Sequence, residues 1–277
     1  MKKMLIALTA AAAFTGSAYA ADLPARMPMK APPPPVPVAS WTGCYVGGGF
    51  GYDLFDQRNT GYLEAPGGVF DGIRAAVTTR TRVTEDVDTG GRGWLGTVQA
   101  GCDYQFGLGS HQFVIGAFGD YDFASIKGNH NPPGTFLVAQ EKMTDAWSVG
   151  GRVGWVVFPQ LMTFFSAGYT EARFGRQDYT NLVGPPFGIA SGLYTDSRWY
   201  KGWFLGAGDE YAVGFLPGLF WKTEYRFSEF NTEVNPIRIT ATGLPTIYSE
   251  DSKKYVQSIR SELVYRFNWG GPVVAKY

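Results

Sequence analysis

The residues that most often carry chemistry are scarce in this chain, which has two histidines, His111 and His130, and two cysteines, Cys44 and Cys102. Acyl transfer requires a Ser–His pair with an orienting group. His111 borders a predicted short turn and His130 lies in a predicted long loop, at opposite ends of one strand, so the two cannot cooperate. Two histidines and two separated cysteines also form no zinc motif. We therefore expect no enzymatic activity, no cofactor and no metal.

The two cysteines could form a disulfide, because the strands predicted around them should pair as a hairpin. With residue 41 near residue 106, Cys44 comes to lie nearly opposite Cys102. An oxidising compartment permits a disulfide between them. Neighbouring strands meet the required Cβ separation only marginally. The alternative of two separate thiols on the outward face therefore stays open.

Composition narrows the class of protein. Lysine plus arginine and aspartate plus glutamate are equal at 24 each in 277 residues. A phosphate-binding surface needs a basic excess, which argues against nucleic acid as a partner. Outside the N-terminus there is no apolar run of about 18 residues, as a membrane-spanning helix needs. The 37 glycines and 16% aromatic residues instead favour an all-β protein, such as a β-barrel in a membrane.

The N-terminus predicts export. Residues 1–20 carry Lys2 and Lys3, a short apolar run and the small-x-small sequence ending at Ala20, which are typical of a signal peptide. The proline-dense residues 21–40 predict an extended periplasmic leader, since proline at this density excludes helices and central strands. Residues 41–277 are then the outer-membrane β-barrel domain.

Alternation with period two along residues 41–277 predicts strands, because successive side chains of a strand point to opposite faces. The segments that alternate are 45–54, 93–106, 112–124, 146–157, 161–174, 202–213, 219–228 and 255–268. Short turns follow the second, fourth and sixth of them, and long polar segments follow the first, third, fifth and seventh, near 56–91, 126–143, 175–198 and 231–252. This arrangement predicts an eight-stranded antiparallel up-and-down transmembrane β-barrel with short periplasmic turns and four long external loops.

The two faces of these strands differ in residue type. One face carries aromatic residues suited to two interfacial girdles: Trp94, Trp147, Trp155, Trp203, Tyr104, Tyr121, Tyr211 and Tyr265. The other face carries glycine and a balanced set of charges, which we assign to a lumenal charge network: Asp103, Asp120, Asp122, Arg152, Glu210, Lys222, Glu224, Arg226, Arg260, Glu262 and Arg266. A soluble sandwich with the aromatics inside is the alternative. Asp209 departs from the pattern, since it falls on the lipid-facing side; hydration at the periplasmic rim or a bulge would explain it.

Several motifs resemble those of the small outer-membrane β-barrel proteins, described as porin-like surface proteins, of rhizobial and related alphaproteobacteria. The motifs are Trp41-Thr42-Gly43-x-Tyr45-Val46-Gly47-Gly48, Gly202-Trp203-x-x-Gly206-Ala207-Gly208-x-Glu210-Tyr211, Lys222-x-Glu224-Tyr225-Arg226, and the ending from Tyr265 to Tyr277. Cys44 and Asp209 depart from this pattern, where an aromatic and an apolar residue are usual.

The resemblance implies an integral outer-membrane protein without enzymatic activity, in contact with outer-membrane lipid and lipopolysaccharide. Its C-terminal strand would be recognised by the barrel-assembly machinery. We expect a role in envelope structure, and little conductance, because an eight-stranded barrel is just wide enough for its own side chains. Two alternatives stay open: a narrow diffusion pore, and a receptor or adhesin that binds haem or a host surface through loop aromatics. The candidate loop aromatics are Tyr62, Phe70, Phe136, Phe187, Tyr194 and Tyr248.

Overall fold

A computed structural model describes residues 39–64, 80–181 and 188–267 as one antiparallel sheet of twelve strands. The strands are β1 (Gly43–Glu64), β2 (Arg80–Arg82), β3 (Val87–Leu108), β4 (His111–His130), β5 (Leu137–Phe158), β6 (Leu161–Phe174), β7 (Gln177–Asn181), β8 (Ala190–Thr195), β9 (Arg198–Ala212), β10 (Leu219–Phe230), β11 (Glu233–Ile239) and β12 (Pro245–Phe267). The predicted signal peptide, nearly all of the proline-rich leader and the last ten residues of the C-terminal motif lie outside the described residues.

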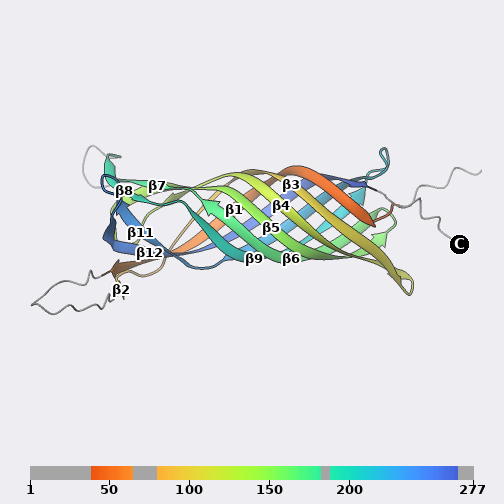
Figure 1. The fold of residues 1–277 in the computed structure, drawn as a ribbon, viewed down its shortest axis with the longest axis horizontal. Helices are drawn as coiled ribbons and strands as arrows, with labels where there is room; N and C mark the ends of the chain where they lie inside the picture. The colour runs from red at the N-terminus through yellow and green to blue at the C-terminus, as the bar shows by residue number, and fades with distance from the viewer. Residues whose placement is uncertain (1–38, 65–79, 182–187, 268–277) are drawn as a thin grey trace, which may run out of the picture. The chain divides into compact units, whose positions relative to one another are not determined.

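Eight of these strands close into a ring. They follow one another in the order β1-β3-β4-β5-β6-β9-β10-β12, and β12 pairs back onto β1 from Cys44↔Phe267 to Leu63↔Tyr248. Figure 1 shows the strands winding around this ring. The prediction of an all-β antiparallel fold is confirmed, and the alternative of two stacked sheets is wrong. The four short strands β2, β7, β8 and β11 were not predicted.

The ring strands extend further than predicted at the end where the long connections lie. β1 reaches Glu64 and β5 begins at Leu137, so the loops predicted near 56–91 and 126–143 were too long. The physical reason is visible in β4 beyond Phe123. The outward residues there become polar, whereas Ile126 and His130 still point inward and are buried. An apolar–polar alternation therefore fades although the strand continues.

The short strands extend the sheet at the same end (Figure 1, left). β2 pairs with β1, β11 with β12, β8 with β11, and β7 with both β8 and β5. The opposite end has tight turns at the positions predicted. Gly109, between β3 and β4, has φ 63° and Gly218, before β10, has φ 85°; this left-handed conformation favours glycine.

The outer wall of the ring is apolar. Trp94 is 65% exposed, Phe165 70% and Ile259 66%. Aromatic side chains of neighbouring strands meet in a belt near the loop end, with ring centroids 5.1 Å apart for Tyr52–Trp94, 5.6 Å for Trp147–Tyr169 and 6.0 Å for Trp203–Phe227. We call this the outer aromatic belt. Aromatics also gather at the other end, where Tyr265 and Phe267 are 5.3 Å apart. Exposed apolar surface bounded by aromatics is the surface that a bilayer requires.

None of the described residues belongs to a helix with the length and apolar character needed to cross a membrane.

Candidate functional site

The inward faces of the strands form the candidate site, and its first layer lies near the end with the tight turns. Asp103 on β3 and Glu210 on β9 are shared between two guanidinium groups, those of Arg152 on β5 and Arg266 on β12. Arg152 is 2.8 Å from Glu210; Arg266 is 2.6 Å from Asp103 and 2.5 Å from Glu210. Arg152 also pairs with Asp103. All four side chains are at most 1% exposed, so each charge is neutralised within the lumen.

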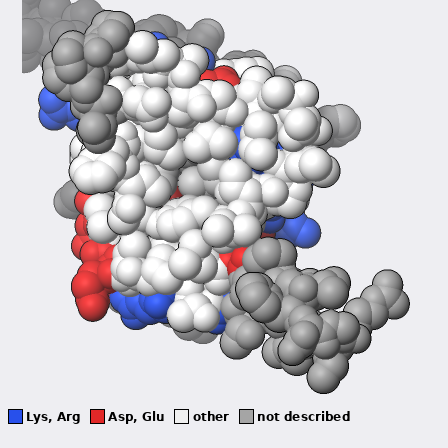
Figure 2. All heavy atoms as spheres, turned by 90° about the vertical axis from the view of Figure 1, so that its left-hand side faces the viewer, with Lys and Arg blue, Asp and Glu red and all other residues white. Residues whose placement is uncertain are grey.

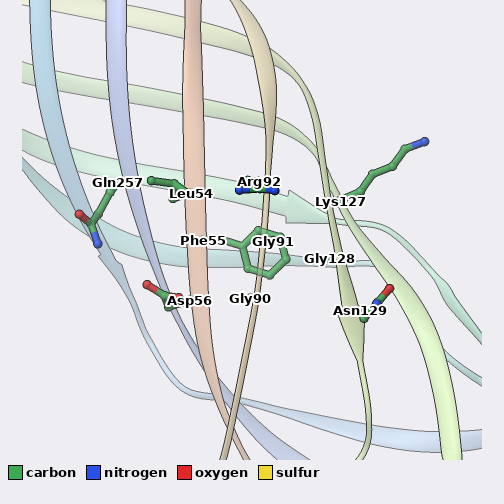
Figure 3. A pocket seen from close by; sticks show the side chains of 10 residues that line it. All are labelled: Leu54, Phe55, Asp56, Gly90, Gly91, Arg92, Lys127, Gly128, Asn129 and Gln257. Carbon is green, nitrogen blue, oxygen red and sulfur yellow. The ribbon is translucent and has the colours of Figure 1, made fainter.

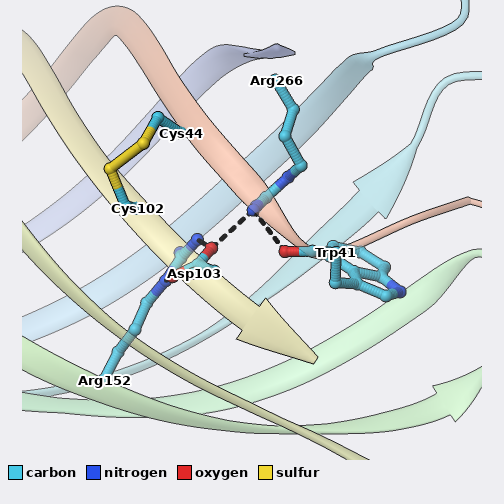
Figure 4. The surroundings of a disulfide bond; sticks show 6 residues. All are labelled: Trp41, Cys44, Cys102, Asp103, Arg152 and Arg266. Atoms are coloured by element: carbon cyan, nitrogen blue, oxygen red, sulfur yellow. Dashed lines mark hydrogen bonds and ion pairs between the residues drawn. A yellow bond between two sulfur atoms is a disulfide. The ribbon is translucent and has the colours of Figure 1, made fainter. Parts of the chain in front are cut away.

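The segment before β1 closes the ring below this layer. The backbone carbonyl of Trp41 accepts a hydrogen bond of 2.8 Å from Nη1 of Arg266, and Figure 4 shows both residues beside Asp103. The Trp41 side chain is fully buried and packs against Phe220 with ring centroids 4.8 Å apart. The tryptophan of the N-terminal motif therefore plugs the lumen.

A second charged layer lies at mid-height. Arg226 is 2.9 Å from Asp120 and 3.3 Å from Glu224, and Lys222 is 2.9 Å from Glu224. Arg260 reaches both Asp120, at 3.3 Å, and Asp122, at 2.5 Å. Glu262 completes the layer beside Lys222. The structure thus places all eleven residues of the predicted lumenal network inside the ring, each buried, and groups them into these two layers. Asp53 is also buried inward; its place in the alternation predicts that face, but it was not included in the predicted network.

Apolar side chains separate and surround the charges, which the sequence analysis did not foresee. One buried cluster packs around the lower layers: Trp41, Tyr45, Val114, Phe118, Met162, Phe164, Phe204, Phe220 and Val264. A second lies above them: Phe55, Leu95, Ala124, Ile126, Met143, Ala146, Ala172, Phe174, Tyr200, Phe230 and Val256. The charges contact these rings directly, since the Arg226 guanidinium lies 4.3 Å from the Phe204 ring centroid. The expectation of a middle made only of glycine and ions was therefore incomplete.

A third polar cluster fills the ring beyond the second apolar layer. His130 Nε2 lies 3.1 Å from the Glu250 carboxylate, and its Nδ1 lies 3.0 Å from Gln57 Nε2. Lys254 is 2.6 Å from Glu141. Burial lowers the pKa of His130, but the attraction of Glu250 and the hydrogen bond to it outweigh burial and raise the pKa above its ordinary value. This cluster was not predicted, because His130 and Glu250 were assigned to loops. The alternation of inward and outward residues along β4 continues beyond Phe123 and places His130 on the inward face.

The two histidines do not come together in the part of the chain that the structure describes. His111 begins β4 and His130 ends it, so the two histidines stay at opposite ends of one strand. His111 packs on Trp155. Across the described residues, no group of three or more His, Cys, Asp or Glu side chains is placed to hold a metal ion.

The two cysteines face each other across β1 and β3. Cys44 is the register partner of Cys102, their sulfur atoms are 2.05 Å apart, and the structure joins them as a disulfide (Figure 4). Both cysteine side chains point outward, whereas the neighbouring Asp103 points into the lumen. Asp209 also points outward; it accepts a hydrogen bond of 2.5 Å from Thr163. Its strand pairs without a register shift on either side, so the bulge proposed for it was wrong.

The loop aromatics considered for ligand capture are placed by the structure only in part. Phe70 and Phe187 lie outside the described residues. Tyr62 packs under Arg80 and Tyr194 under Arg176, while Tyr248 donates a hydrogen bond to the carbonyl of Pro133. Phe136 is 73% exposed. Seen from the loop end, uncharged residues cover most of the visible face and charges lie toward its edge (Figure 2).

Comparison with known proteins gives relatives over almost the whole chain. The 31 kDa outer-membrane immunogenic proteins of Brucella melitensis and Brucella suis are each 29% identical over 270 residues, which cover 96% of this chain and 100% of theirs. No protein-family model matches the chain.

Two solved structures are similar at low sequence identity. The outer membrane protein OprG of Pseudomonas aeruginosa is 12% identical, covers 83% of this chain and 100% of its own, and has a TM-score of 0.44. Ail, the attachment invasion locus protein of Yersinia pestis, is 10% identical, covers 78% and 99%, and has a TM-score of 0.32. TM-scores below 0.5 add no weight of their own. The chain is an outer-membrane protein related to the alphaproteobacterial outer-membrane immunogenic proteins, as its sequence motifs indicated.

Proposed function

We propose that this protein is a non-enzymatic structural component of the outer membrane that presents loops to the outside. In this proposal the eight-stranded ring spans the bilayer, residues 1–20 direct export, and the tight turns face the periplasm. Two features support this orientation: the short turns all lie at one end and the longer connections lie at the other. Bacterial barrels keep their longer loops outside.

The filled lumen carries the proposal. Two layers of paired charges, two apolar clusters and the Trp41 plug occupy the interior, and their side chains are almost inaccessible. Buried ions that are paired on several sides are expensive to separate. A ring of eight strands leaves no room for a water path beside such side chains. The interior therefore stabilises the barrel and does not conduct.

Planar-bilayer recording tests this. Folded protein is reconstituted at a density verified by the different gel mobility of heated and unheated samples, and a large water-filled porin at the same density is the positive control. We expect no stable conductance steps from this protein. Reproducible steps of one size from heat-modifiable protein would overturn the structural proposal and favour a narrow diffusion pore.

A second candidate function is capture of a host surface or of a ligand such as haem through the loops. The relatives named immunogenic support surface exposure of the loops, and the short strands extend the sheet well past the outer aromatic belt. Glu64 and Arg80 are register partners, so residues 65–79 can be replaced by a two-residue Asn-Gly turn without breaking the hairpin. Envelope integrity should survive this deletion. Loss of cell adhesion or haem binding, with heat-modifiability retained, would favour the receptor function.

A further inference from the structure

Three cations stand in one row on the outer wall of the ring. Arg92 on β3 is the register partner of Lys127 on β4, and Lys127 is the register partner of Lys142 on β5. The inward side chains beside them, Ile126 and Met143, are buried, so the row points away from the lumen. Neighbouring strands are about 4.8 Å apart, which gives a row about 10 Å long.

The row has no ion pair among the described residues, whereas other cations of the outer wall have a carboxylate opposite or beside them; Arg173 and Lys201 are register partners of Asp145 and Glu171. Arg58 pairs with Asp88 at 3.2 Å and Lys253 with Glu229 at 2.6 Å. Asp145 accepts a hydrogen bond from Tyr121. By contrast, no carboxylate of the described chain lies within 4.0 Å of the side-chain nitrogens of Arg92, Lys127 or Lys142. Like charges directly opposite one another destabilise a strand pair, and local conflicts of this kind are expected where a site serves a ligand.

A hollow of about 490 Å³ lies beside the row (Figure 3). Its wall includes Arg92, Lys127 and the backbones of Gly90, Gly91 and Gly128. Asp56 adds one carboxylate to the lining. Three cations and one anion leave a net charge of about +2 there.

The position of the row relative to the aromatics indicates what fills it. Trp94 belongs to the outer aromatic belt, and Arg92 is the next outward residue of β3 toward the loop end. The register partner of Arg92 on β1 is Leu54. Interfacial aromatics mark the level of lipid headgroups. An anion held there therefore has an apolar bilayer directly beneath it, as the phosphate of a lipid does and a soluble anion does not.

We propose that Arg92, Lys127 and Lys142 bind the phosphates of a lipid A headgroup, the phosphorylated glycolipid of the outer leaflet, with its sugar over the glycine-lined hollow. Arg92 supplies the planar donor pair for one phosphate and the lysines act as point charges. The inference uses the orientation proposed above, in which the loop end faces outward.

The test compares two triple variants of the full chain, folded in detergent, by native mass spectrometry. R92Q/K127Q/K142Q removes the row. R173Q/K201Q/K253Q removes the same charge from other strands, where Arg173 and Lys201 are register partners of Asp145 and Glu171. The probes are bis-phosphorylated lipid A, the same lipid without phosphates, and inorganic phosphate. Each interfacial cation contributes roughly fivefold to binding an anionic headgroup, so the row variant should bind phosphorylated lipid A about 100-fold more weakly. The control variant should bind within about threefold of the parent.

Three outcomes would overturn the proposal: equal binding by the row variant, equal binding of the lipid lacking phosphates, or displacement of lipid A by inorganic phosphate at millimolar concentration. The last would mark a site for free anions. Failure here is separable from failure of the structural function, since conductance is recorded on the parent. The orientation is tested separately by adding a protease to intact cells. Cleavage of the protein within residues 65–79 would support the orientation in which the loop end faces outward.

Discussion

Glu250 holds His130 at 3.1 Å inside the loop end of the ring, and so ties β12 to β4 across 120 residues of sequence. Both side chains are 1% exposed. Charged and titratable groups surround the pair from every side: Glu141 on β5, Lys254 on β12 and Tyr179 on β7. The contact therefore adds a second link across the lumen between β4 and β12, which Arg260 also joins through Asp120 and Asp122.

The His130–Glu250 contact predicts a pH dependence at the loop end. The pKa of His130 is raised in the folded protein, so its stabilisation is fully present below the ordinary value of about 6.5 and is lost as the pH rises through the folded value. Hydrogen exchange at the ends of β4 and β12, corrected for intrinsic rates, should be slower at pH 6 than at pH 8.5. In H130Q the corrected rates should not change with pH. A pH effect of equal size in H130Q would contradict this origin.

The lower charged layer predicts a large cost for removing one arginine. R152M leaves Asp103 and Glu210 to share Arg266 alone, and a buried ion without its partner costs about 3–5 kcal/mol. The free energy of unfolding in lipid vesicles, followed by tryptophan fluorescence in urea, should fall by that amount. The exposed control R173Q should change it by less than about 0.5 kcal/mol. Equal losses in both variants would mean that the lumenal pairs are not buried as described.

The disulfide gives a prediction on chemistry as well as stability. Denatured, unreduced protein should show no reactive thiol, and reduction should release two. The bond closes a loop across a sequence separation of 58 residues, so C44S/C102S should lower the free energy of unfolding by roughly 2–4 kcal/mol. Two thiols without reduction would show that the cysteines stay apart in the cell.

The sequence was most informative where lipid contacts the wall. Outward residues of β3 such as Trp94, Val98 and Tyr104 must be apolar there, whereas the alternating residues Thr97, Gln99 and Asp103 point into the lumen. The alternation therefore predicted both that this segment is a strand and which face points inward. The alternation of apolar and polar residues is weakest along residues 161–174, which form β6, and the structure explains why: Met162 and Phe164 point inward into an apolar cluster, while Phe165 faces lipid. Apolar residues on both faces remove the alternation.

The loop end was the least predictable part, because water replaces lipid outside and the alternation is lost. His130, Glu141 and Lys254 look like loop residues in the sequence, yet they fill the ring. Their partners come from strands more than a hundred residues away, since 113 residues separate Lys254 from Glu141. A local sequence pattern carries no information on contacts between residues so far apart in the sequence. The cation row was missed for the same reason, since it exists only once three strands are in register.

Adjacent residues 209 and 210 test the inside-out character of the barrel most directly. Asp209 points outward near the tight-turn end of β9 and Glu210 points into the lower charged layer. An acidic residue on the lipid face costs stability, by less than about 1 kcal/mol near the interface, so D209L should raise the free energy of unfolding in vesicles by up to that amount. E210L should lower it by about 3–5 kcal/mol, because Arg152 and Arg266 lose a shared partner. Both substitutions replace an acidic side chain with leucine and lie one position apart, so opposite signs are the result expected when the bilayer lies outside and the ions inside. A loss of stability in both variants would place residue 209 in water and remove the basis for a lipid-facing wall.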